Sequence, residues 1–204
     1  MTDRAGAVAG AGADLRDEPV DPDVVDSDLV YEGRVWDVRS DTIRYGDEEI
    51  VRQYVDHPGA AAVVAIDDDE RVLLIQQYRH PIRYRDWEVP AGLLDVAGES
   101  PRETALRELA EEADLVAETC EPLVSIFTTP GGNDEVVHLF LARGLSAHHT
   151  PHPREAEEAD IRLEWVPLAD AVDGVLAGRL RNGILVAGVL AAAETLRRRA
   201  SAGE

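Results

Sequence analysis

Apolar and polar residues alternate along residues 28–57, which is the pattern of β-strands with one buried face. Gly46 and Asp47 interrupt this alternation with the composition of a tight turn. We therefore expect a small antiparallel β unit over residues 28–57. Residues 1–27 are rich in alanine, glycine, aspartate and proline and show no periodicity, so we expect a flexible tail ahead of this unit.

Residues 58–200 carry longer apolar runs, separated by polar turns, and are expected to form the main domain. Continuous apolar runs are typical of strands that are buried on both faces. The segments expected to form strands read GAAAVVAID, VLLIQQYRH, WEVPAG, LVSIFTTP, EVVHLFLARGL and IRLEWVPL. Helices flank this strand-rich middle part, which makes the domain a mixed α+β domain.

The clearest helix signal starts at Ser100-Pro101. Serine is a favourable N-cap, proline fits the first helical position, and Glu103 completes the sequence pattern of a capping box. Apolar residues then recur at helical spacing, at Ala105, Leu106, Leu109 and Ala113. Two further helices are expected, over DAVDGVLAG and over ILVAGVLAAAETLRRR, the latter capped by Asn182.

Charge and composition indicate which binding partners and which cellular compartment to expect. The 204 residues include 41 acidic and 20 basic residues, all of the latter arginine, which gives a net charge of −21. Duplex nucleic acid and anionic membranes both require a basic surface, so we expect neither as a partner. A single cysteine, Cys120, excludes an intramolecular disulfide and suits the cytoplasm. We identify no export signal, and the longest apolar stretch is about half of a membrane span.

Three acids in the first predicted helix are the strongest chemical signal. Glu108 and Glu112 are four residues apart and emerge on one helix face, and Glu111 lies beside both. Like charges at this spacing destabilise an isolated helix by a few tenths of a kcal/mol. Two interpretations are open at this point: a solvated acidic face, or a site for Mg²⁺ or Mn²⁺, which prefer carboxylate oxygens and can offset the charge of a diphosphate.

The segment from Gly92 to Leu115 resembles the Nudix box. The matching positions are Glu99, Arg107, Glu108, Leu109, Glu111, Glu112 and Leu115. Two positions depart from the family pattern. Gly92 lies one residue further from Glu99 than usual, which implies a longer loop, and Asp114 replaces a glycine that would form a left-handed helix cap.

This resemblance implies a Nudix fold, an αβα sandwich with a mixed sheet. It also implies that Glu108, Glu112 and the backbone carbonyl of Ala91 bind the metal, which would be Mg²⁺ with Mn²⁺ as an alternative. Glu99 would support the geometry of the loop and helix.

The resemblance also suggests which residues take part in catalysis. Glu111 would be a further ligand or act through water, and Arg107 would orient the glutamates by ion pairing. The segment HHTPHPREAEEADIRLEW resembles an acidic loop that closes over the metals. In that loop Glu158 is the best match for the acid that binds metal or deprotonates the attacking water, with Glu155 and Glu157 as alternatives.

The segment QQYRHPIRYRDWEVPAGLLD and Pro130 resemble the ADP-ribose pyrophosphatase subfamily of Nudix hydrolases. By this resemblance Arg79 would contact the substrate phosphates. Arg52 is a second candidate, with a solvent-facing strand position as the alternative. In this subfamily the N-terminal unit exchanges between the subunits of a homodimer, so Trp36 would stack on adenine or pack in the interface. Further substrate-binding positions implied by the resemblance are Leu93, Thr129 and Glu135.

We therefore expect a metal-dependent hydrolase that cleaves the diphosphate bond of ADP-ribose to give AMP and ribose 5-phosphate. The same chemistry on another nucleoside diphosphate sugar or on a dinucleotide is the first alternative. A catalytically silent Nudix module that senses a nucleotide is the second.

Overall fold

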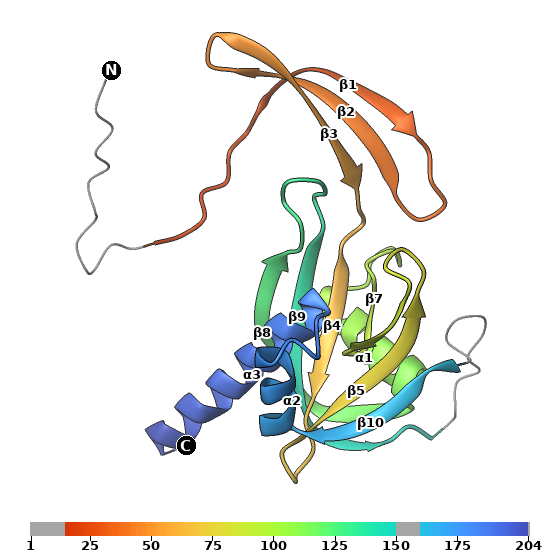
Figure 1. Cartoon of the computed structure of the whole chain (residues 1–204), viewed down its shortest axis with the longest axis vertical. Coiled ribbons are helices and arrows are strands. Elements are labelled where there is room, and N and C mark those ends of the chain that lie inside the picture. Colours follow the sequence, from red (N-terminus) through yellow and green to blue (C-terminus); the bar gives the residue numbers. More distant parts are fainter. Residues whose placement is uncertain (1–14, 150–159, 204) are drawn as a thin grey trace.

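The structure is a computed structural model that describes residues 15–149 and 160–203, and its N-terminal strands form a separate sheet (Figure 1). This antiparallel sheet has the order β1-β2-β3, with β1 at Asp23–Tyr31, β2 at Asp37–Tyr45 and β3 at Glu48–Asp56. The turn between β2 and β3 is Gly46-Asp47, as predicted, and Gly46 has a left-handed φ of 64°.

Strand β1 begins earlier than the sequence pattern predicted. It starts at Asp23, inside the segment predicted to be a tail. The acidic residues of β1 obscure its alternation, but the register places Asp23 opposite Arg44, and the two side chains form an ion pair of 2.9 Å. This contact joins strands that are distant in sequence, and local periodicity cannot reveal it.

In its described residues, the main domain contains two sheets and three helices. The mixed four-stranded sheet has the order β7-β4-β9-β8, with β4 and β9 parallel. Its strands are β4 (Ala60–Ala65), β7 (Ala91–Leu93), β8 (Leu115–Phe127) and β9 (Val136–Ala147). The second sheet has the order β10-β5-β6 and consists of β5 (Arg71–Arg79), β6 (Tyr84–Glu88) and β10 (Arg162–Pro167). The helices are α1 (Pro101–Ala113), α2 (Leu168–Leu176) and α3 (Gly183–Ala202).

Strand β4 lies between two helical layers, which confirms the predicted αβα sandwich. Its alternate side chains enter two different cores. Ala62 and Val64 pack in the core that contains residues of α2 and α3. Ala61 and Val63 pack in the core that contains residues of α1. Because side chains of a strand alternate between faces, burial on both sides explains why this segment is uniformly apolar.

Helix α1 begins and ends as its sequence predicted. Ser100 is the N-cap, its side chain accepts a hydrogen bond from the N–H of Glu103, and the reciprocal contact completes the capping box. At the other end Asp114 adopts φ 55° and ψ 39°, the left-handed cap conformation that a glycine would normally provide. Within the described residues, no helix is long and apolar enough to cross a membrane.

Candidate active site

The loop through β7 contacts the acidic face of α1. Glu112 is only 5% exposed, and its carboxylate accepts a hydrogen bond of 3.0 Å from the backbone N–H of Ala91. A Cβ atom on Gly92 would lie 1.8 Å from Glu108 Oε1, so a side chain at this position would displace that carboxylate. The fold thus brings together Ala91, Glu108 and Glu112, three of the four positions predicted to bind metal. The fourth, Glu158, lies outside the described residues.

Arg107 is the cation between the acids of the predicted box. Its guanidinium donates to Glu99 at 3.1 Å, to Glu108 at 2.6 Å and to Glu111 at 3.2 Å. Thr104 donates a further hydrogen bond of 2.9 Å to Glu99. The hydrogen bonds from Arg107 hold the pKa of Glu99 below its usual value, and Glu99 in turn raises the pKa of Arg107. This arrangement offsets the repulsion between the carboxylates and fixes the orientation of Glu108.

The donor set has the chemistry of a site for a hard divalent cation. The Glu108 side chain is 13% exposed and the Glu111 side chain is 42% exposed, so carboxylate oxygens range from buried to accessible. The glycine at position 92 leaves space beside Glu108 that a side chain would fill. Among the residues that the structure describes, however, no three histidine, cysteine, aspartate or glutamate side chains already converge on one point.

Arg79 is held by a carboxylate that sequence reasoning missed. Its guanidinium makes two hydrogen bonds of 2.7 Å to Glu88, which is 5% exposed and also contacts Gln77 at 3.4 Å. The Arg79 side chain remains 43% exposed. The signal available in the sequence was a glutamate next to Trp87 at the end of a short strand, but the pairing depends on the register of β5 with β6.

A second cluster connects the N-terminal sheet to the segment that follows β8. The Trp36 ring stacks on the His57 ring, with centroids 5.3 Å apart and planes at 26°. His57 Nε2 lies 3.6 Å from Glu135 Oε1, and Thr128 donates a hydrogen bond of 2.5 Å to the same carboxylate. Two predicted substrate-binding residues, Trp36 and Glu135, are therefore joined through His57, which sequence reasoning did not single out.

The NUDIX domain family model matches residues 56–186. The chain belongs to the Nudix family. It is 44% identical over 172 residues to an ADP-ribose pyrophosphatase of Mycobacterium tuberculosis, covering 84% of this chain and 83% of that protein. It is 36% identical to an ADP-ribose pyrophosphatase of Bacillus subtilis, covering 70% and 77%. A crystal structure of an ADP compounds hydrolase, 20% identical, shares the fold with a TM-score of 0.72 over 90% of this chain and 98% of that one.

Other predicted positions lie outside this Nudix-box cluster. Arg52 is exposed on β3 and donates to the carbonyl of its neighbour Val51 at 2.9 Å, which fits the solvent-facing interpretation within a single chain. Leu93 is half-buried in β7 and pairs with Ala60. The backbone carbonyl of Thr129 accepts two hydrogen bonds in the turn that contains Pro130. Glu158 and its alternatives Glu155 and Glu157 lie outside the described residues.

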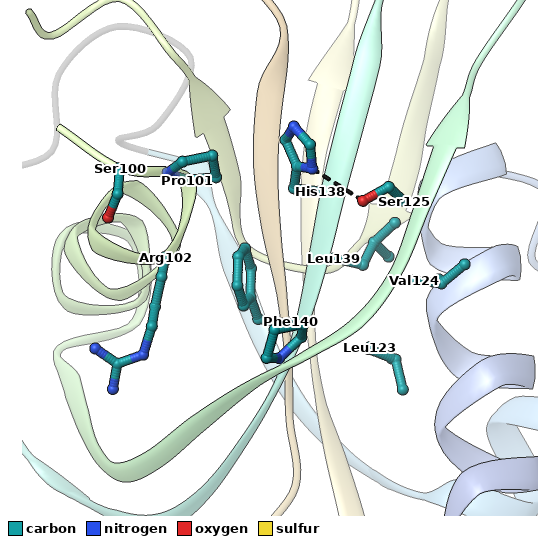
Figure 2. A pocket seen from close by; sticks show the side chains of 10 residues that line it. Ser100, Pro101, Arg102, Leu123, Val124, Ser125, His138, Leu139 and Phe140 are labelled. Carbon is teal, nitrogen blue, oxygen red and sulfur yellow. Dashed lines mark hydrogen bonds between the residues drawn. The ribbon is translucent and has the colours of Figure 1, made fainter. Parts of the chain in front are cut away.

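A cavity at the first turn of α1 is separate from the Nudix acids. It has a volume of about 400 Å³ and is lined by the first turn of α1 and by parts of β8 and β9 (Figure 2). One polar contact in its lining joins Ser125 Oγ and His138 Nδ1 at 2.9 Å, which Figure 2 marks with a dashed line. Its described lining contains neither a carboxylate nor any of the predicted site residues, so we do not assign the diphosphate chemistry to it.

Proposed function

We propose that this Nudix protein hydrolyses the diphosphate bond of ADP-ribose, giving AMP and ribose 5-phosphate, and that it requires a divalent cation, Mg²⁺ or Mn²⁺. The observation that carries the proposal is the arrangement of Glu108 and Glu112 against the glycine loop, with Arg107 among the acids. The similarity to proteins named ADP-ribose pyrophosphatase supports this choice of substrate.

Each residue of the site has a proposed task. Glu108, Glu112 and the carbonyl of Ala91 would hold the cation, and Glu111 would assist directly or through water. When bound, the cation would supply positive charge that offsets the diphosphate and the negative charge developing at phosphorus. Arg107 would keep the carboxylates oriented, since it already contacts Glu108 and Glu111.

The positively charged Arg79, whose side chain is 43% exposed, would bind a phosphate oxygen with its guanidinium. Its two bonds to Glu88 fix the guanidinium plane, which reduces the entropy that must be lost when the phosphate binds. Glu158 remains the proposed acid for activating the attacking water.

Substitution of Glu112 by glutamine tests the proposal. The amide oxygen of Glu112→Gln can still accept the Ala91 N–H, but the negative charge is lost, so the fold should persist while cation binding weakens. We expect the Mg²⁺-dependent kcat/KM for ADP-ribose to fall about a hundredfold or more. The matched control is Glu164→Gln, an exposed change on β10 that should leave the rate unaltered. An unchanged rate in Glu112→Gln would refute the site.

A substrate panel separates this proposal from its alternatives. Measured values of kcat/KM for ADP-ribose, GDP-mannose and diadenosine compounds, each with and without Mg²⁺, should favour ADP-ribose. A clear preference for another compound would replace the substrate. Tight ADP-ribose binding without turnover would instead favour a catalytically silent sensor.

We also propose that the active form is a homodimer joined through the N-terminal sheet. Exposed apolar side chains on this sheet support the proposal, because soluble monomers rarely carry large contiguous apolar surfaces. These side chains, all at least 46% exposed, are Val24, Val25, Leu29, Val30, Tyr31, Tyr45 and Val51.

A further inference from the structure

His57 lies where three separate segments meet: the end of the N-terminal sheet, the turn that carries Trp36, and residues 128–135. The backbone N–H of Gly59 donates to His57 Nδ1 at 3.0 Å. Because Nδ1 is the acceptor, the ring hydrogen of neutral His57 is on Nε2, which faces Glu135 at 3.6 Å. With an 8% exposed side chain, His57 is a fixed and buried connection.

The segment that contains Pro130 is bound to the same place by its backbone. The N–H of Val55 donates to the carbonyl of Gly132 at 3.0 Å, and the N–H of Asp134 donates back to Val55 at 3.3 Å. The Asp134 carboxylate accepts the N–H of His57 itself at 2.8 Å. Val55 and His57 therefore fix the segment that ends in Glu135.

Trp36 packs on His57, follows a tight turn and still presents surface to solvent. One ring face packs on His57, while the side chain remains 46% exposed. The preceding turn is tight, because a Cβ on Gly33 would lie 2.0 Å from the carbonyl oxygen of Trp36, and the N–H of Gly33 bonds to Asp37 at 3.0 Å. An indole that is fixed and partly exposed is a surface on which a nucleotide base can stack.

We infer that His57 is a positioning residue, which holds Trp36 in register with Glu135 so that one rigid surface receives the nucleoside end of the substrate. This inference rests on the proposed function. The described contacts of His57 are with Trp36, Gly59, Asp134 and Glu135, which are neither box acids nor Arg79. We therefore expect His57 to affect substrate binding and to leave the chemical step unchanged.

Two substitutions at His57 separate the stacking of its ring from the hydrogen bonding of its ring nitrogens. His57→Phe keeps an aromatic ring against Trp36 but removes both ring nitrogens. His57→Asn keeps an acceptor for the N–H of Gly59 but removes the stacking ring. The matched control is His138→Phe, a histidine on β9 whose contact is with Ser125.

We expect His57→Asn to raise KM for ADP-ribose about tenfold, which corresponds to the loss of one stacked base contact. Its kcat and its half-saturating Mg²⁺ concentration should stay within about twofold of the wild type. The KM of His57→Phe should lie between that of the wild type and that of His57→Asn. The KM of His138→Phe should match that of the wild type. The dissociation constant of AMP, measured by calorimetry, should change in parallel with KM.

A double-mutant cycle with Trp36→Ala completes the test. If His57 acts through Trp36, adding His57→Asn to Trp36→Ala should raise KM by less than about twofold more. The inference would be overturned if the effects of the two substitutions on KM were fully additive. It would also be overturned by an unchanged KM in His57→Asn, or by a loss of kcat that follows thermal instability. A wild-type protein that does not hydrolyse ADP-ribose would refute the proposed function, and this inference with it. Wild-type activity with unaffected His57 variants would refute the inference alone.

Discussion

At the scale of single residues, the three helical acids are held in three different ways. Glu112 is buried and bonded to a backbone N–H, Glu108 is bonded to Arg107 beside Gly92, and Glu111 is the most exposed. A buried carboxylate is costly unless it is hydrogen-bonded, so the contacts of Glu112 and Glu108 are needed to keep these two acids in place. The sequence spacing does not distinguish the three acids, whereas their burial and hydrogen bonds in the structure do.

Gly92→Ala should damage the site while it leaves the fold largely intact. The added methyl group would collide with Glu108, whose carboxylate would have to leave its position. We expect the half-saturating Mg²⁺ concentration for ADP-ribose hydrolysis to rise about tenfold or more. Gly183→Ala is the control, because a Cβ at that position meets nothing within 4 Å. Equal Mg²⁺ dependence in the two variants would show that Gly92 is not required for metal binding.

At the scale of elements, α1 is defined by hydrogen bonds at both of its own ends. The capping box satisfies N–H groups that otherwise lack partners, and the left-handed Asp114 closes the other end. This local definition places the acids on the correct helix face, so the stability of the first turn and the geometry of the site are linked.

Ser100→Ala should destabilise the protein by about 1 kcal/mol at neutral pH, measured by urea unfolding. The hydrogen bonds from Ser100 hold the pKa of Glu103 below its usual value of 4.5. The carboxylate is therefore favoured in the folded state, and its stabilising contribution is complete above that pH and is lost as the pH falls through the lowered pKa. The difference in the free energy of unfolding between Ser100→Ala and the wild type should therefore shrink as the pH falls. Ser201→Ala, an exposed change near the end of α3, is the control. A difference that grows on acidification would contradict this account.

Local sequence signals predicted α1 and its acids because caps, helical spacing and the box all act over short distances. They did not predict the Glu88 partner of Arg79 or the contact of His57 with Glu135, because both depend on strand register and on segments distant in sequence. Strand β8 was also predicted too short. It begins at Leu115, and its exposed side of polar residues hides an edge strand from a search for apolar runs.

At the scale of the whole molecule, the N-terminal sheet extends away from the main domain and β3 leads directly into β4 (Figure 1). The described contacts between the sheet and the domain gather at its base, near Val55 and His57. The exposed apolar side chains further out form the surface through which we propose that a second copy of this chain binds.

Light scattering should give a mass of two 22.2 kDa chains for the wild type at assay concentration. The double variant Leu29→Asp, Val30→Asp should shift the mass towards that of one chain, because it places two charges among the exposed apolar residues of the N-terminal sheet. Leu176→Asp, a change at a 73% exposed leucine of α2, should leave the mass unaltered. An active wild-type monomer would exclude the dimer.

The hydrogen bond from Ala91 to Glu112 makes one backbone amide a spectroscopic reporter of the site. A proton donated to a carboxylate resonates at a position that depends on the electron density of the acceptor oxygen. Coordination of a cation by Glu112 would withdraw that density and move the nitrogen and proton resonances of Ala91. Titration followed at this single peak would therefore count cation occupancy in the resting protein, without any turnover of substrate.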